Sequence, residues 1–469
     1  MNEPLTISFQ GAARTVTGSR HLIRLGSRRL LFDCGLFQGR RDEAERVNRA
    51  FAFEPEALDA VVISHAHLDH IGNLPTMAAR GYSGVIHATP ATADLSTVML
   101  PDAAFLMAKD VEHVNRHRKP GTPEREPLYA MADVERVIER MKTHAYGERF
   151  EPIPGASVEF HDAGHILGSA FAVLEFRSGE QTFRLGMSGD VGRPGRPILR
   201  DPEAMPGVDA LVMECTYGDR LHPSADEAVK GLAAVITRTL ARGGRVLIPA
   251  FAVGRSQELV VTLHGLMERR EIREVPIFVD SPLAWKATQA FRRHPECFDA
   301  ETHHALDAED GASLGFDRLH YTVTVEQSQA LNQRRGPCIV IAASGMCEGG
   351  RILHHLQHGL ANEKNTVLFV GFQAQHTLGR RLRDGQSPVR VFGEPIVPRA
   401  EIAAQDGFSA HADQRELIEW VARIPTPPRT IYLVHGEIEP AETLAELLRR
   451  RFGATVRIPQ PGEEFPLWN

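Results

Sequence analysis

The sequence predicts an α/β protein of the α+β type with two domains, and three observations predict it. Short apolar runs separated by glycine and polar residues open the chain and return at residues 156–187, as in antiparallel sheets. Residues 220–397 instead alternate between helix and strand patterns, which implies a parallel sheet covered by helices. Residues 399–469 then resume the pattern of the first part, so the simplest topology has the parallel domain inserted into the other.

The composition is that of a globular protein with a large core. The chain has 469 residues, of which 42% are hydrophobic and 24% charged. The net charge of −7 argues against a general polyanion-binding surface but allows a local basic groove. No apolar run reaches membrane-spanning length, and no signal peptide is apparent. The five cysteines show no CxxC pairing, which favours reduced thiols and a cytoplasmic location.

The first apolar runs, at residues 5–9, 21–25 and 29–33, predict an antiparallel opening that ends at Asp33. Two interpretations of Asp33 stay open. It is either an ordinary turn residue or a carboxylate that orients a metal-binding histidine.

The next strand pattern, residues 60–63, leads into a loop of potential metal ligands. His65, His67, Asp69 and His70 follow that run within six positions. Imidazole and carboxylate are ligands that zinc prefers, and sites in α/β layers form beyond strand ends. The alternative is a polar helix start, with Asp69 as its cap and solvated histidines. The number of ligand-type residues favours a metal site.

Polar residues of the same kind follow later strand patterns. His165 lies between glycines on a loop between two strands. Asp190 and Glu214 each follow a strand pattern, and His411 and His435 lie in the last segment.

Residues 91–149, between His70 and His165, are predicted to form helices outside the sheet. Its histidines, His113, His117 and His144, are expected to be solvated.

The parallel domain contains features that suit phosphate binding. The glycine-rich segment 344–351 opens a predicted helix, and helix N-termini attract phosphate. The predicted phosphate-contacting residues are Ser344, Gly345, Arg351, Arg255, Arg380 and Ser409. Three further histidines, His354, His355 and His358, are expected to lie on a solvated helix face outside the site.

These motifs resemble a known family. The segment from His65 to His70, followed by His165 and Asp190, resembles the signature of the metallo-β-lactamase superfamily. Glu214, His411 and His435 resemble the additional motifs of the β-CASP nucleases. Further matching stretches are residues 216–220, 249–255, 280–284, 343–346 and 371–374. The chain is similar to bacterial and archaeal relatives of the endonuclease subunit of the cleavage and polyadenylation specificity factor.

The resemblance implies a metallo-β-lactamase αββα sandwich, residues 1–215 and 399–469, interrupted by a β-CASP domain at residues 216–398. It also implies two zinc ions. One would be bound by His65, His67 and His165, the other by Asp69, His70 and His435, with Asp190 bridging them. The implied catalytic residues are Glu214, His411, Asp69 and Asp33, with Asp33 behind the histidine loop. Glu214 and His411 would form an acid/base pair. In the alternative, Glu214 is structural and His411 only donates a hydrogen bond to phosphate.

The function that the resemblance implies is a zinc-dependent ribonuclease that hydrolyses single-stranded RNA. It would cut internally, and trimming in the 5′–3′ direction is a second activity to be tested. His435 is typical of the family's RNA-acting members. A homodimer is left open, although we expect no long C-terminal dimerisation domain and no extra N-terminal RNA-binding domain. The alternatives are a dinuclear-zinc hydrolase of small esters, thioesters or phosphodiesters, and an inactive RNA-binding subunit, which should lack some metal ligands.

Overall fold

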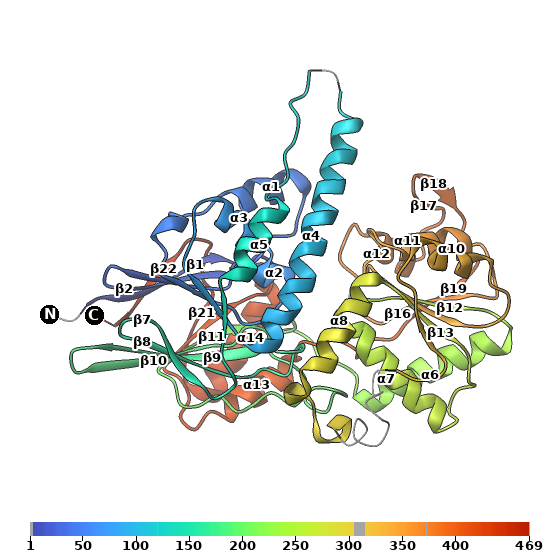
Figure 1. Ribbon diagram of the computed structural model, residues 1–469. Helices are drawn as coiled ribbons and strands as arrows, with labels where there is room; N and C mark the ends of the chain where they lie inside the picture. Colours follow the sequence, from blue (N-terminus) through green and yellow to red (C-terminus); the bar gives the residue numbers. More distant parts are fainter. Residues whose placement is uncertain (1–2, 120, 304–314, 372, 469) are drawn as a thin grey trace. The chain divides into compact units, whose positions relative to one another are not determined.

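The computed structural model describes residues 3–119, 121–303, 315–371 and 373–468, which form two compact units (Figure 1). Phe372, within one of the matching stretches, lies outside the described residues. The first unit comprises Met1–Pro194, Asp201–Leu221 and His411–Asn469, and the second comprises Gly195–Arg200 and His222–Ala410. The chain returns to the first unit at His411 rather than at residue 399, because the strand Glu401–Ala404 pairs within the second unit.

The first unit contains two seven-stranded sheets. The first sheet has the order β22-β1-β2-β3-β4-β5-β6. It is antiparallel from β22 to β3 and parallel from β3 to β6. Its strands are β22 (Glu464–Trp468), β1 (Leu5–Gly11), β2 (Arg20–Leu25), β3 (Arg28–Phe32), β4 (Ala60–Val62), β5 (Val85–Ala88) and β6 (Met141–Thr143).

The second sheet has the order β21-β20-β11-β10-β9-β8-β7. It is antiparallel from β7 to β10 and parallel from β10 to β21. Its strands are β7 (Arg149–Ile153), β8 (Ala156–Asp162), β9 (Ala170–Ser178), β10 (Gln181–Met187), β11 (Ala210–Glu214), β20 (Thr430–Val434) and β21 (Thr455–Arg457).

One hydrophobic core lies between these sheets, and helices cover their outer faces (Figure 1). Alternate residues along each strand point inward, so Ile7 and Phe32 of one sheet pack in the same cluster as Phe160 and Leu185 of the other. The helices near the first sheet are α1 (Arg41–Arg49), α2 (Leu68–Ile71), α3 (Leu74–Ala79), α4 (Pro90–Arg116) and α5 (Met131–Glu139), with a short 3₁₀ turn at Pro55–Ala57. Helices α13 (Gln414–Ala422) and α14 (Ile438–Phe452) pack on the second sheet. This is the four-layer sandwich that the resemblance implies.

The second unit is a parallel α/β domain whose six-stranded sheet has the order β14-β13-β15-β12-β16-β19. Both faces are buried, since Val246 and Ile248 of one strand pack in one cluster and Leu247 between them in another. The strands are β12 (Val246–Pro249), β13 (Ile277–Asp280), β14 (Leu319–Tyr321), β15 (Ile339–Ala342), β16 (Thr366–Phe369) and β19 (Glu401–Ala404), with a hairpin of β17 (Val389–Val391) and β18 (Glu394–Ile396).

Six described helices flank this sheet. One cluster packs α6 (Ala225–Ala241), α7 (Arg255–Glu268) and α8 (Pro282–Arg293) against it, and the other packs α10 (Val325–Gln333), α11 (Ile352–Gly359) and α12 (Leu378–Arg383). A 3₁₀ turn lies at Pro295–Cys297. Among the described residues of the whole chain, no helix is long and apolar enough to cross a membrane.

Candidate metal centre and catalytic pair

The predicted site residues of the first unit gather because their strands run side by side in the same direction. In the first sheet, β3 and β4 are parallel with Phe32 opposite Val62, so the segments after them, which carry Asp33 and His65, start at the same edge. In the second sheet, β10, β11 and β20 are adjacent and parallel. Segments that lie far apart in the sequence thus deliver their polar residues to one edge of the sandwich.

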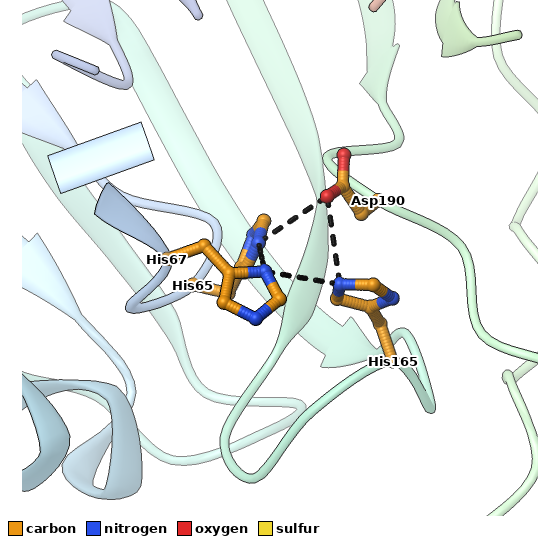
Figure 2. Close-up of side chains that lie close together, drawn as sticks. All are labelled: His65, His67, His165 and Asp190. Atoms are coloured by element: carbon orange, nitrogen blue, oxygen red, sulfur yellow. Dashed lines mark hydrogen bonds and ion pairs between the residues drawn. The ribbon is translucent and has the colours of Figure 1, made fainter. Parts of the chain in front are cut away.

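Three histidines and one aspartate form a first cluster (Figure 2). His65 Nε2 lies 3.0 Å from His67 Nδ1, and His165 Nε2 lies 3.2 Å from the same atom. The Oδ2 atom of Asp190 lies 3.3 Å from His65 Nε2 and 3.5 Å from His165 Nε2. Figure 2 shows the four side chains pointing toward one another. One nitrogen from each ring and one carboxylate oxygen therefore face a common point.

These three imidazoles are neutral at physiological pH, with lone pairs available for a metal. Burial is the main cause: it lowers the pKa of His65 to about 3 and that of His67 to about 4. Burial also lowers the pKa of His165 well below its usual value. Neutral imidazole is the form that binds zinc.

Asp69, His70 and His435 form a second cluster beside the first. The Nε2 atoms of His70 and His435 lie 3.2 Å apart, and His435 Nε2 lies 3.4 Å from an oxygen of Asp69. The other oxygen of Asp190, Oδ1, lies 3.4 Å from His70 Nε2. Asp190 thus directs one carboxylate oxygen at each cluster.

The donors of both clusters fit a pair of cations. Asp190 is 1% exposed, and neither of its oxygens accepts a hydrogen bond from the described residues. A buried carboxylate in that state is costly unless positive charge is close. Burial alone would lower the pKa of His70, but Asp190 and Asp33 outweigh it and raise that pKa well above its usual value. Without a metal ion, Asp190 and Asp33 therefore favour a proton on the His70 ring, close to where a cation would lie.

Asp33 lies behind the histidine loop and fixes the orientation of His70. His70 Nδ1 and Asp33 Oδ2 are 2.7 Å apart, which directs the opposite ring nitrogen, Nε2, at the second cluster. The backbone N–H of Ser64 donates to Asp33 Oδ1 at 2.8 Å, and the Ser64 hydroxyl donates to Asp33 Oδ2 at 3.0 Å. Gly35 has no room for a side chain, since an added Cβ would come 1.6 Å from the carbonyl oxygen of Asp69.

Glu214 and His411 form a pair at the edge of the first cluster. The Nδ1 atom of His411 lies 3.1 Å from Glu214 Oε2 and 3.9 Å from Asp190 Oδ2. Burial alone would lower the pKa of His411, but Glu214 and Asp190 outweigh it and raise the pKa to about 9. Glu214 is fully buried, whereas the side chain of His411 is 21% exposed. The geometry thus provides a protonated imidazole that is open to a bound molecule.

Two contacts in this site were not assigned from the sequence. Ser64 joins Asp33 to the loop, and the hydroxyl of Thr216 lies 3.1 Å from His435 Nδ1. Both are neighbours of predicted residues in the sequence, since Ser64 precedes His65 and Thr216 lies two positions after Glu214. That proximity is the signal that could have identified them.

Two expectations about histidines were wrong. His144 is not solvated but 2% exposed, because its ring stacks on Phe150 and its Nε2 lies 3.0 Å from His87 Nδ1. His355 is 3% exposed, because it faces inward from α11 and donates from Nε2 to Asp280 at 2.6 Å. His113, His117, His354 and His358 are exposed as expected.

The residues predicted to contact phosphate lie in the second unit and differ in their surroundings. Arg351 donates to Asp280 at 2.8 Å, and Arg255 donates to the carbonyl of Val370 at 2.5 Å. Arg380 pairs with Asp384 at 2.8 Å, with its side chain 41% exposed. The backbone N–H of Glu348 donates to Ser344 Oγ at 3.2 Å. Gly345 packs against the ring of Phe251, and Ser409 is 9% exposed. A phosphate role for these residues stays a prediction.

Family models match three parts of the chain. They are the Metallo-beta-lactamase superfamily at residues 16–157, the Beta-Casp domain at residues 256–382, and the Zn-dependent metallo-hydrolase RNA specificity domain at residues 396–459. The chain thus contains a metal-dependent hydrolase domain, and the predicted fold class is confirmed.

Known proteins resemble the chain over nearly its whole length. Ribonuclease TTHA0252 of Thermus thermophilus is 39% identical over 459 residues, which cover 97% of this chain and 99% of that protein. Transcription termination factor FttA of Methanocaldococcus jannaschii is 31% identical over 469 residues, covering 97% of this chain and 70% of that protein. A crystal structure of a protein of unknown function from Enterococcus faecalis V583 shares the fold, with a TM-score of 0.55, 13% identity, and coverage of 99% of this chain and 100% of that one.

The identity to the Thermus protein, over almost the full length of both chains, is far more than a shared fold would give. Together with the Beta-Casp match, it shows that the chain belongs to the β-CASP branch of the metallo-β-lactamase superfamily.

Proposed function

We propose that the protein is a zinc-dependent ribonuclease that hydrolyses phosphodiester bonds of single-stranded RNA. The observation that carries this proposal is the arrangement around Asp190. Its two oxygens face two separate groups of metal-ligating atoms, and Glu214 and His411 lie beside the first group. Two adjacent cations and one positioned acid are the parts that in-line hydrolysis of a phosphodiester needs.

RNA as the substrate is supported by the comparisons. The relative from Thermus thermophilus is named a ribonuclease, and the model that matches residues 396–459 is described as an RNA specificity domain. A hydrolase of small esters or thioesters would need neither the inserted parallel domain nor the Glu214–His411 pair.

We assign the zinc ligands as predicted, with Asp190 held in common. His65, His67 and His165 would hold one ion, and Asp69, His70 and His435 would hold the other. When bound, the two zinc ions supply a hydroxide nucleophile at neutral pH and offset the charge of the phosphate. Asp33 keeps the His70 ring in the tautomer that leaves Nε2 free for its ion.

His411 acts as the proton donor. The charge of Glu214 favours the protonated ring, which is partly exposed, so its other nitrogen, Nε2, is the atom that would donate a proton to the oxygen leaving the phosphorus. Glu214 contributes by its charge and holds the ring through Nδ1. Because the water-derived nucleophile makes the 2′-hydroxyl unnecessary, preference for RNA must come from binding contacts.

Three further parts of the proposal concern the rest of the molecule. Ser344, Gly345, Arg255, Arg351, Arg380 and Ser409 are proposed to follow the RNA backbone. The cut is proposed to be internal, with 5′–3′ trimming as a second activity. The five cysteines are free and buried, which supports a reducing cytoplasmic location.

The test is cleavage of 5′-labelled single-stranded RNA by the purified protein, with and without a chelator. We expect a ladder of labelled fragments that disappears with the chelator. Asp69→Ala should abolish the ladder, and Asp59→Asn, an exposed carboxylate outside the clusters, should leave it unchanged. Cleavage at the wild-type rate by Asp69→Ala would refute the zinc assignment. Release of the label as a mononucleotide would indicate 5′–3′ trimming rather than internal cutting.

A further inference from the structure

The segment from Asp190 to Arg193 connects three parts of the site through backbone contacts. The N–H of Val191 donates to Glu214 Oε1 at 2.6 Å, and the carbonyl of Val191 accepts from the N–H of Ala412 at 2.8 Å. One residue therefore binds the carboxylate of the catalytic pair and the residue that follows His411. Its position sets the distance between the two members of that pair.

The same segment is fitted closely to the loop that carries His165. The N–H of Gly192 donates to the carbonyl of Ala163 at 2.7 Å. A Cβ on Gly192 would lie 1.8 Å from the carbonyl oxygen of Gly164, so only glycine permits this approach. The segment is thus held on one side by the His165 loop, and its other side contacts Ala412 and the start of α13.

On that other side lies a buried ion pair between Arg193 and Glu416. Arg193 Nε is 3.1 Å from Glu416 Oε2, and the two side chains are 5% and 10% exposed. Glu416 Oε2 also accepts from the N–H of Asp413 at 2.8 Å, while Asp413 Oδ1 accepts from the N–H of Glu416 at 2.9 Å. These reciprocal bonds form a capping box at the start of α13, three residues after His411.

We infer that Arg193 and Glu416 are positioning residues for His411. Glu416 fixes the turn that leads from His411 into α13, and Arg193 ties Glu416 to the segment that carries Asp190 and binds Glu214. The pair thereby sets where the His411 ring lies relative to Glu214 and the first metal cluster. This inference rests on the proposed function, since it assigns the pair a role in the step that His411 performs.

A positioning role differs from a merely stabilising one in what it predicts for catalysis. Misplacing a proton donor slows the chemical step without weakening the metal ligands or substrate binding. We expect Arg193→Gln to lower kcat about 10–100-fold with KM nearly unchanged. Zinc content should remain that of the wild type, because neither side chain is among the metal ligands. Arg193→Lys keeps the charge beside Glu416 and should recover part of kcat.

The decisive experiment is a double-mutant cycle on the full-length, zinc-loaded protein. If Arg193 acts through His411, then Arg193→Gln should change kcat less than about 2-fold in a His411→Ala background. Val421→Ala is the matched control for stability, because Val421 is a fully buried residue of the same helix and lies more than one turn from Glu416. It should lower the thermal midpoint while kcat stays near the wild-type value.

Two results would overturn the inference. One is a cycle in which the losses from Arg193→Gln and His411→Ala multiply. The other is an equal loss of kcat in Val421→Ala. An inactive wild-type protein would contradict the ribonuclease proposal instead, and amide hydrogen exchange then decides the role of the pair. Exchange at residues 411–413 should be faster in Arg193→Gln than in Val421→Ala, and equal rates in both would also overturn the inference.

Discussion

His411 is the residue whose chemistry depends most on its neighbours. In water, imidazole is mostly neutral at pH 7 and is a poor proton donor. Here the carboxylates of Glu214 and Asp190 overcome the effect of burial and raise the pKa of His411 to about 9. Without bound zinc, the acid form therefore persists through neutral pH.

This pKa predicts the alkaline limit of the reaction. The rate that depends on His411 should fall at alkaline pH, because the ring then loses its proton, and bound zinc, which offsets the charge of Asp190, should place this fall below pH 9. Glu214→Gln removes the charge that contributes most to raising the pKa of His411, so the fall should begin at lower pH. The measurement is kcat against pH at constant zinc. Glu175→Gln, a charge change on β9, should leave the profile in place. An unchanged profile in Glu214→Gln would mean that His411 is not the donor.

Asp33 predicts a different effect, on metal affinity. In Asp33→Asn the partner of His70 loses its charge, so the His70 ring becomes a weaker ligand. Loss of such a partner typically lowers metal affinity about 10–100-fold. Competition between the protein and a zinc-binding dye measures this. Asp59→Asn changes a carboxylate that accepts from the N–H of Arg29 and should keep wild-type affinity. Equal affinity in Asp33→Asn and wild type would leave Asp33 as an ordinary turn residue.

At the scale of elements, Asp280 joins several segments of the second unit. It ends β13, is fully buried and accepts hydrogen bonds from Thr322, Ser328, Arg351 and His355. Burial alone would raise its pKa, but these hydrogen bonds hold it well below the usual value. Since α11 begins beside Arg351, this carboxylate anchors the end of the glycine-rich segment 344–351.

The prediction for Asp280 concerns stability and its pH dependence. A carboxyl whose pKa is lowered by folding stabilises the protein above its unfolded value of 3.8, and this contribution is lost as the pH falls below it. Breaking a buried pair costs about 3–5 kcal/mol, so Asp280→Asn should lose that much at pH 7 and less in acid. Asp384→Asn breaks an exposed pair with Arg380 and should cost no more than about 1 kcal/mol. Urea unfolding at pH 7 and pH 3.5 measures the free energy of unfolding of both variants. A loss in Asp280→Asn that is as small as that in Asp384→Asn, or that does not shrink at pH 3.5, would contradict the role of Asp280.

At the scale of the whole molecule, each unit has its own hydrophobic clusters, and the predicted metal ligands all belong to the first unit. A ligand stabilises only the folded unit that binds it. Calorimetry should therefore show two unfolding transitions, of which zinc removal lowers one by several degrees and leaves the other in place. Asp69→Ala should remove this sensitivity. A chelator that shifts both transitions equally, or neither, would contradict the assignment of the metals to the first unit.

Much of this organisation could be predicted from the sequence, because the signals are local. The runs before His65, Asp190 and Glu214 are apolar strands, and polar residues after parallel strands meet at one edge. The return of the chain to the first unit at His411, rather than at residue 399, could not be predicted, because only the pairing of β19 with β16 keeps Glu401–Ala404 in the second unit.

Side-chain burial was also hard to predict. His144 and His355 look solvated by spacing, yet each is buried by a partner far away in the sequence, His87 and Asp280. The Arg193–Glu416 pair spans 223 positions and leaves no trace in either local pattern. Contacts of this kind become visible only when both segments have been placed.

The most direct measurement is a zinc titration of the chelator-treated protein that records bound zinc per chain and the rate of RNA cleavage together. If segments from β4 to β20 hold two ions through Asp190, cleavage should return as occupancy approaches about two per chain. Asp190→Asn should fail to regain it at any zinc concentration that leaves the protein folded. Full cleavage without bound zinc, or in Asp190→Asn, would contradict the account.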